Sequence, residues 1–261
     1  MEAALEAAGA GVGEVEAEEE VGVEAEEVVL DAADEPSGAP AGPPVHEPRH
    51  FQRATVTVGA AELVLKGEDQ HLVREEEVAG TTLHFALIAD GHGGKEAALA
   101  CKRAVVNDMI QQLVARDDGS VRGSAVRDAG RRAFERVHAA VLKDGRTTAG
   151  STLTVVVVNG ARHEVTVLHC GDSVARLVPH RSNCSALCED HRIDTSEAER
   201  ERLKRLGGKI AHATGKNGGP SGPLRLWPGG VAQARAIGDR DVGAFIDAQP
   251  FAQTVRLPEG E

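Results

Sequence analysis

Short apolar runs with alternating or β-branched positions recur along the body of the chain and predict β-strands. These runs occupy residues 60–65, 83–89, 153–158 and 165–170. Their lengths are typical of strands rather than helices. Asn159-Gly160 separates the last two runs, and this pair favours a tight turn with positive φ. Residues 153–170 are therefore predicted to form an antiparallel hairpin.

Longer stretches with apolar positions every three or four residues predict three helices. Within residues 95–115, one face repeats at four-residue intervals through Ala97, Cys101, Val105, Met109 and Leu113. A second helix is predicted over residues 124–142. A third begins at Ser196, which has capping-box spacing to Glu199, and ends at Gly207-Gly208. Antiparallel strands with separate helices predict an α+β fold rather than a doubly wound sheet.

Residues 211–230 interrupt this periodic pattern with six glycines and three prolines. Such a composition predicts a long irregular surface loop, and loops of this kind often carry specificity. Trp227, the only tryptophan of the chain, is interpreted as the anchor that pins this loop to the body. Contact between Trp227 and a substrate is the alternative.

Charge divides the chain into two parts. Residues 1–50 hold 14 of the 41 acidic residues and one of the 29 basic residues, which leaves 27 acids and 28 bases for the body. The net charge of −12 therefore comes from the amino-terminal segment. Residues 1–49 are predicted to be a disordered acidic tail and linker, serving either to dock a basic partner or as a solvated spacer. Residues 50–261 are expected to hold the folded domain.

Several classes of protein are disfavoured by composition. No segment resembles a secretory signal, an organelle transit peptide or a membrane span of about 20 apolar residues, so a soluble cytoplasmic or nuclear monomer is expected. The nearly neutral body and six aromatic residues argue against nucleic-acid binding. The four cysteines are expected to be reduced thiols. His180, Cys184, Cys188 and His191 have zinc-like intervals, but the stretch lacks a Cys-x2-Cys pair.

The run FALIADGHGG at residues 85–94 ends a predicted strand with an acid, followed by glycines and a histidine. Such a strand end places the Asp90 carboxylate where the backbone turns sharply and approaches a ligand closely. The Asp90 carboxylate and the Gly91 carbonyl are oxygen donors, which suit Mg²⁺ or Mn²⁺. His92 lies beside them and can act as a general acid, because an ordinary imidazole has a pKa of about 6.5.

A second acidic pair, Glu68-Asp69, follows the first predicted strand and can supply a further oxygen ligand. Each segment alone is also consistent with a plain turn, but six motifs occur together in order. They are GEDQ (67–70), DGHGG (90–94), AGSTLTVV (149–156), CGDS (170–173), EDHRIDTSEAERERLKRLGGKI (189–210) and RLWPGGVAQARAIGDRDVG (225–243). From about residue 54 to residue 257 the chain resembles the PP2C (PPM) family of metal-dependent protein serine/threonine phosphatases.

The resemblance implies two stacked antiparallel β-sheets flanked by helices, with a two-metal site at one edge. Carried over by position, Asp90 bridges two Mg²⁺ or Mn²⁺ ions, and Glu68 and the Gly91 carbonyl complete the protein ligands of one. Asp69 holds metal-bound water. Asp172 corresponds to an aspartate associated with a third, weaker metal. Two such ions lower the pKa of a bridging water and neutralise developing charge, so no covalent phosphoenzyme is needed.

The resemblance also implies how a phosphoprotein substrate is handled. His92 protonates the leaving serine or threonine oxygen, while Asp90 acts through the metals. The family usually places an arginine that contacts the substrate phosphate four residues before the acid equivalent to Glu68. Val64 stands there instead, and Lys66 is the candidate replacement. A lysine is a point charge without the bidentate fork of arginine, so phosphate binding is expected to be weaker or differently arranged.

Some positions of the chain depart from the family pattern, and others match it but are interpreted as structural. Val174 stands where an arginine normally follows CGDS, and the Asp-Gly and Asp-Asn motifs that bind the second metal do not occur before Glu261. Two hypotheses follow: a fragment of an active phosphatase, which the retained catalytic motifs favour, or a non-catalytic module that binds a phosphoprotein. Arg235 and Asp239, in the last motif, are interpreted as residues that pin a loop.

Overall fold

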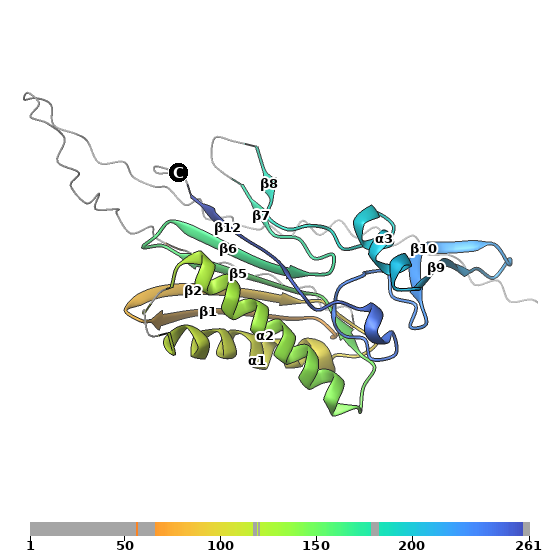
Figure 1. Cartoon of the computed structure of the whole chain (residues 1–261), viewed down its shortest axis with the longest axis horizontal. Coiled ribbons are helices and arrows are strands. Elements are labelled where there is room, and N and C mark those ends of the chain that lie inside the picture. Colours follow the sequence, from red (N-terminus) through yellow and green to blue (C-terminus); the bar gives the residue numbers. More distant parts are fainter. Residues whose placement is uncertain (1–55, 57–65, 117–118, 120, 179–182, 258–261) are drawn as a thin grey trace, which may run out of the picture. The chain divides into compact units, whose positions relative to one another are not determined.

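A five-stranded antiparallel sheet, in the order β1-β2-β5-β6-β12, organises the part of the chain that the structure describes (Figure 1). The structure is a computed structural model that describes residues 56, 66–116, 119, 121–178 and 183–257. The predicted tail at residues 1–49 and the predicted strand at residues 60–65 lie outside these residues. The predicted α+β class with antiparallel sheets is confirmed.

Three strands of this sheet follow the predicted apolar runs: β2 (Thr81–Ala89), β5 (Leu153–Asn159) and β6 (Glu164–Cys170). In β2, alternate side chains are buried because successive residues of a strand point to opposite faces. β5 pairs antiparallel with β6 from Leu153 opposite Cys170 to Asn159 opposite Glu164. The predicted hairpin is therefore confirmed.

The outer strands β1 (Gln70–Val78) and β12 (Phe251–Arg256) were not predicted from the apolar pattern. β1 reads QHLVREEEV, and its charged half hides the alternation that marks a strand. It nevertheless pairs with β2 along its whole length, from Gln70 opposite Ala89 to Val78 opposite Thr81. Pairing with β2 therefore makes this segment a strand, although its own sequence pattern does not indicate one.

The predicted irregular loop at residues 211–230 is wrong. β9 (Lys209–Thr214) and β10 (Pro220–Trp227) form a two-stranded antiparallel sheet there. Most glycines and prolines of this stretch lie in the connecting turn, at a register shift between Ser221 and Leu224, or just after β10, so they leave the pairing largely intact. Trp227 Nε1 donates a hydrogen bond to the carbonyl of Ala211 at 3.1 Å, which joins β10 to β9 within the hairpin, so its role as an anchor to the body stays a prediction.

The three predicted helices are confirmed as α1 (Glu96–Val114), α2 (Gly123–Asp144) and α3 (Glu197–Arg205). α1 and α2 pack against each other over one face of the large sheet, where α1 contacts β1 and β2, and α2 contacts β6 and β12 (Figure 1). The Ser196 side chain accepts a hydrogen bond from the backbone N–H of Glu199 at 3.4 Å and so caps α3.

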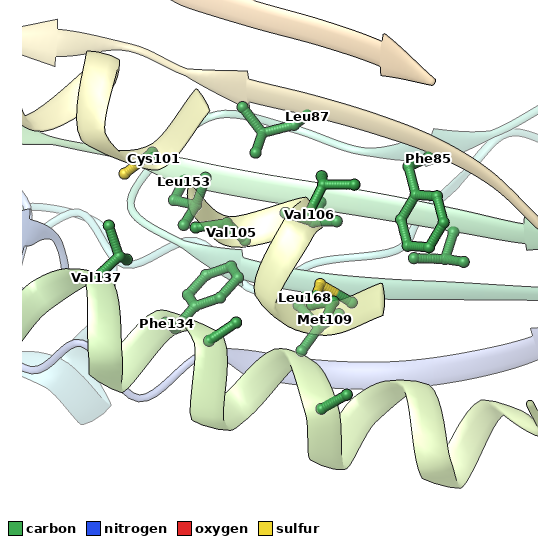
Figure 2. Packing of buried hydrophobic residues seen from close by; sticks show 14 of the residues in the cluster. Phe85, Leu87, Cys101, Val105, Val106, Met109, Phe134, Val137, Leu153 and Leu168 are labelled. Atoms are coloured by element: carbon green, nitrogen blue, oxygen red, sulfur yellow. The ribbon is translucent and has the colours of Figure 1, made fainter. Parts of the chain in front are cut away.

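The main hydrophobic core lies between these two helices and the sheet. Figure 2 shows Phe85 of β2, Met109 of α1 and Phe134 of α2 packed together with Leu168 of β6. All four side chains are at most 1% exposed. A second cluster surrounds α3 and consists of Ile193, Leu203, Leu226, Val231, Ala234, Ala236, Val242 and Ile246.

Three small elements complete the described fold. β3 (Gly91–His92), β4 (Gly150–Ser151) and β11 (Ile237–Gly238) form a three-stranded sheet, and β7 (Arg176–Leu177) pairs with β8 (Ser185–Ala186). A short 3-10 helix covers Gly243–Phe245. Within the described residues, no helix is both long and apolar enough to cross a membrane.

Candidate active site

The small sheet of β3, β4 and β11 brings three distant parts of the sequence to one place. β4 is the central strand, with Ser151 opposite Gly91 on one side and opposite Ile237 on the other. Gly150 likewise lies opposite His92 and opposite Gly238. Since β3 directly follows β2, the large sheet fixes where this cluster begins. The backbone register therefore places His92 and Gly238 on the two sides of Gly150, and Asp239 directly follows Gly238.

Asp90 is held between β2 and β3 by contacts with Thr152. The backbone N–H of Asp90 donates to Thr152 Oγ1 at 3.1 Å, and the N–H of Thr152 donates to the Asp90 carbonyl at 2.9 Å. Thr152 Oγ1 also lies 2.8 Å from Ser173 Oγ. These bonds involve only the backbone groups of Asp90, so they fix its position without engaging its carboxyl group.

The predicted acidic pair lies directly against this strand end. Asp69 Oδ1 accepts a hydrogen bond from Gly91 N at 3.3 Å, and Glu68 Oε1 accepts one from Gly94 N at 2.9 Å. A Cβ atom at Gly91 would overlap the carbonyl oxygen of Glu68. Only glycine at this position lets the two segments approach so closely. The structure thus brings Glu68, Asp69, Asp90 and Gly91 together, as the sequence predicts.

Negative charge is concentrated at Asp90. Burial raises the pKa of the Asp90 carboxyl, and the neighbouring carboxylates of Asp69 and Asp172 raise it further. Like charges disfavour the ionised form unless a cation lies between them. The arrangement therefore has the electrostatic character of a cation site that is under repulsion when no cation is bound.

The donor chemistry fits Mg²⁺ or Mn²⁺, because carboxylate and carbonyl oxygens are the ligands these hard cations prefer. The complete ligand set is not assembled, however. Among the described residues, no group of three or more His, Cys, Asp or Glu side chains is arranged to hold a metal ion. The zinc-like arrangement includes His180, which lies outside the described residues.

The imidazole of His92 contacts two polar side chains, Asp239 and Gln233. Its Nε2 lies 2.7 Å from Oδ1 of Asp239, and its Nδ1 lies 3.2 Å from Nε2 of Gln233. Burial opposes the charged imidazolium, but the hydrogen bond to Asp239 and the charges of Asp239, Asp90 and Asp172 outweigh it and raise the pKa of His92 above its ordinary value. The site therefore favours a histidine that carries a proton.

Asp172 lies at the same site but has a partner of its own. Its Oδ2 lies 3.0 Å from Nη1 of Arg192, in an ion pair that is partly exposed. Arg192 also contacts Asp194 at 3.2 Å. The predicted role of Asp172 as ligand of a third metal stays a prediction, because the structure places it near Asp90 and also pairs it with an arginine.

A cavity of about 600 Å³ opens over these residues. Asp90, His92, Asp172 and Lys66 all line it. Lys66 is exposed and lies at the cavity together with the candidate catalytic groups, where its ammonium can reach an anionic ligand. The residues predicted to act on a substrate therefore face one common space. Lys66 as a phosphate-binding residue stays a prediction.

Two participants of the site did not emerge from the sequence. Asp239 was interpreted as a residue that pins a loop, and the structure instead sets its carboxylate against His92. Gln233 was not singled out. They lie 147 and 141 residues from His92 in sequence, so only the tertiary structure reveals them. Asp239 follows β11, which pairs with β4, and Gln233 forms an isolated bridge with Arg192. The signal available in the sequence was the acid that ends ARAIGD.

Comparison with known sequences places these features in a family. The sequence model of the family described as Protein phosphatase 2C matches residues 63–261. "Probable protein phosphatase 2C 5" of Arabidopsis thaliana is 33% identical over 216 residues, which are 80% of this chain and 49% of the relative. "Probable protein phosphatase 2C 40" of Oryza sativa subsp. japonica is 33% identical over 212 residues, 78% of this chain and 44% of the relative. The chain spans about half the length of the curated relatives it matches.

Solved structures agree on the fold. A sex-determining protein of C. elegans superposes with a TM-score of 0.63 at 20% identity, over 75% of this chain and 46% of that chain. A serine-threonine phosphatase 2C of Toxoplasma gondii superposes with a TM-score of 0.54 at 20% identity, over 73% of this chain and 78% of that chain. Since the family model covers most of the sequence, including every predicted site residue, the chain belongs to the protein phosphatase 2C family.

Proposed function

We propose that the protein hydrolyses phosphoserine and phosphothreonine in protein substrates with the help of Mg²⁺ or Mn²⁺. The observation that carries the proposal is the common cavity, which is lined by two acids (Asp90 and Asp172), a histidine (His92) and a lysine (Lys66). A phosphate monoester needs these three kinds of group: oxygen ligands for cations, a proton donor for the leaving oxygen and a positive charge for the phosphate. The family and its named relatives support the same activity.

Asp90, Glu68 and the Gly91 carbonyl would hold the cations, with Asp69 beside them. Mg²⁺ or Mn²⁺, when bound, supplies Lewis-acid charge that activates water and offsets the charge of the phosphoryl group. Thr152 keeps the backbone of Asp90 in place through its two hydrogen bonds. The chain's own task at this end of the cavity is to present carboxylates at a fixed position before substrate arrives.

His92 would deliver a proton to the seryl or threonyl oxygen as the bond between phosphorus and oxygen breaks. An alkoxide is a poor leaving group, so proton delivery is expected to contribute on the order of 100-fold or more to the rate. The raised pKa of His92 suits this role, since more of the ring is protonated near neutral pH. Lys66 would attract the phosphate as a point charge.

The proposal is tested by phosphate release from a phosphothreonine peptide, with Mn²⁺ or with EDTA. The expected result is release that requires Mn²⁺ and is lost in Asp90→Ala, while Glu201→Ala, an exposed acid of α3, retains it. Lys66→Met should raise KM with kcat little changed, and Lys209→Met in β9 is the matched control. Metal-independent release, or equal loss in both acid variants, would sink the proposal. Binding of the phosphopeptide without turnover would favour a non-catalytic module.

A further inference from the structure

The side chain of Asp239 is buried and directed at His92, and a residue that only pins a loop does not need this arrangement. Its residue is 2% exposed, and its Oδ1 is directed at Nε2 of His92 at 2.7 Å. Its other carboxylate oxygen, Oδ2, has no hydrogen-bond partner among the described residues. A buried carboxylate is costly unless it is paired, so its contact with His92 is the interaction that compensates its burial.

The backbone around Asp239 is fixed from two directions. The N–H of Gly238 donates to Nδ1 of His138 on α2 at 3.1 Å, and the N–H of Asp239 donates to the Ala149 carbonyl at 3.2 Å. Asp239 has a φ of +56°, a left-handed conformation that few residues other than glycine adopt. Aspartate tolerates this region better than most, and the surrounding bonds hold it there. The carboxylate is thus placed by the fold, independently of His92.

Gly150 provides the space in which the two side chains meet. His92 and Gly238 lie opposite Gly150 on the two sides of β4. A Cβ atom at Gly150 would overlap both Asp239 Oδ1 and His92 Nε2. The imidazole and the carboxylate therefore pack directly over a glycine of the central strand. Such packing restricts the rotation of the imidazole ring as well as its position.

We propose that Asp239 is a positioning residue for His92, an inference that rests on the proposed function. Asp239 accepts a hydrogen bond from Nε2–H, while the amide nitrogen of Gln233, which lines the same cavity, lies 3.2 Å from Nδ1 and 3.5 Å from Nε2. Because a carboxylate only accepts hydrogen bonds, its contact places the hydrogen of the neutral ring on Nε2 and leaves the lone pair on Nδ1. Nδ1 is then the nitrogen that exchanges a proton with the substrate. In serine proteases, too, a buried carboxylate holds the catalytic histidine in one tautomer.

The proposed step is the transfer of a proton from His92 to the leaving group. The protonated ring gives its Nδ1 proton to the leaving seryl or threonyl oxygen, which takes the electron pair of the broken bond between phosphorus and oxygen. The oxygen of a water molecule forms the new bond to phosphorus and its protons stay with the phosphate. The products are an alcohol, inorganic phosphate and a neutral imidazole that keeps Nε2–H on Asp239. Asp239 itself neither gains nor loses a proton, so it acts through His92 and does not touch the reacting atoms.

The first experiment observes the ring directly and requires no turnover. The ring nitrogens of His92 are assigned by ¹⁵N NMR in the full chain, in the wild type, Asp239→Asn and Asp241→Asn, at a pH where the imidazole is neutral. The expected result is the Nε2–H tautomer in the wild type and in Asp241→Asn, and a mixture of tautomers in Asp239→Asn. Asp241 is the matched control because it is an exposed acid in the same segment. An Nδ1–H wild type, or identical spectra in all three proteins, would overturn the proposal.

The second experiment separates positioning from a merely structural role by varying the leaving group. Asp239→Asn should lower kcat for a phosphothreonine peptide on the order of 100-fold, because proton delivery to an alkoxide fails. The loss should be less than about 3-fold for p-nitrophenyl phosphate, whose leaving group departs without a proton. Asp239→Glu should restore part of the peptide activity. Equal losses on both substrates would contradict the proposal.

Different results would contradict the proposed function and the positioning role of Asp239. If the wild type with Mn²⁺ releases phosphate from neither substrate, the proposed function fails, and the NMR comparison still decides whether Asp239 holds the ring. If the wild type is active but Asp239→Asn matches it on the peptide, the positioning role fails alone. Should Asp239→Asn not fold, the wild-type tautomer decides the question by itself.

Discussion

His191 gives the structure an acid-sensitive point that can be measured without knowledge of the substrate. The residue is 1% exposed, and its ring stacks on that of His169 with centroids 5.1 Å apart. Its Nδ1 accepts a hydrogen bond from the N–H of Gly171 at 3.1 Å. A proton on Nδ1 would face that N–H, so the charged form cannot keep this bond. Burial, followed by the charges of Arg235 and His169, lowers the pKa of His191 to about 3.

The direction and size of the effect follow from linkage. Because the folded pKa is depressed, the unfolded state binds a proton that the folded state does not, and the stability is fully present above the ordinary imidazole pKa of roughly 6.5. It is lost as the pH falls from that value toward about 3. At about pH 5, some 1.5 pH units below the ordinary value, His191 alone costs about 2 kcal/mol of unfolding free energy.

Urea denaturation of the full chain at about pH 7.5 and about pH 5 measures this loss. His191→Asn provides an uncharged acceptor for the Gly171 N–H and should reduce the difference between the two pH values by about 2 kcal/mol relative to the wild type. His212→Asn, an exposed histidine of β9, should leave the difference unchanged. The reasoning would be refuted if His191→Asn lost as much stability on acidification as the wild type.

Three further substitutions test the packing around the site. Glu199→Gln removes a buried carboxylate that pairs with Arg202 and Arg235, each at 2.7 Å, and should cost about 3 kcal/mol of unfolding free energy in urea. On the proposed function, Gly150→Ala should abolish activity on a phosphopeptide, measured as phosphate release, because its Cβ would displace the imidazole of His92. Phe134→Ala empties the core contact of α2 and should cost about 3 to 5 kcal/mol in the same urea assay.

Each of these has an outcome that would contradict it. Glu199→Gln is compared with Glu201→Gln, whose exposed partner is Lys204, and equal costs would mean that burial of the first pair is immaterial. Full activity of Gly150→Ala would show that the site has room for a methyl group. A cost below about 1 kcal/mol for Phe134→Ala would place this ring outside the core.

Much of the fold was predictable because local periodicity and capping agree with the tertiary structure. The four-residue repeat of α1 and the Ser196 cap of α3 each specify a helix without reference to the rest of the chain. β1 escaped prediction because its charged residues hide the alternation, and only pairing with β2 makes it a strand. The β9 and β10 hairpin was missed because glycines and prolines were taken as marks of an irregular loop, although most lie in turns.

The candidate site divides in the same way. Asp90, Gly91 and His92 are consecutive, so their proximity is visible in the sequence, and the family motif gave Glu68 and Asp69. Asp239 meets His92 only through the pairing of distant short strands across β4, and Gln233 comes from a segment bridged to Arg192. Two-residue strands carry too little pattern to be recognised, so these contacts could not be derived from spacing. The complete metal ligand set likewise stays a prediction.

The most direct test of the central claim, that the carboxylates around Asp90 form a cation site, is the thermal unfolding midpoint of the full chain with Mn²⁺ and with EDTA. The account predicts that Mn²⁺ raises the wild-type Tm, since a ligand that binds only the folded state stabilises it. Asp90→Asn should exceed the wild type in EDTA, because repulsion with Asp69 is removed, and should gain nothing from Mn²⁺. A wild type indifferent to Mn²⁺, or an Asp90→Asn variant that gains as much as the wild type, would contradict the account.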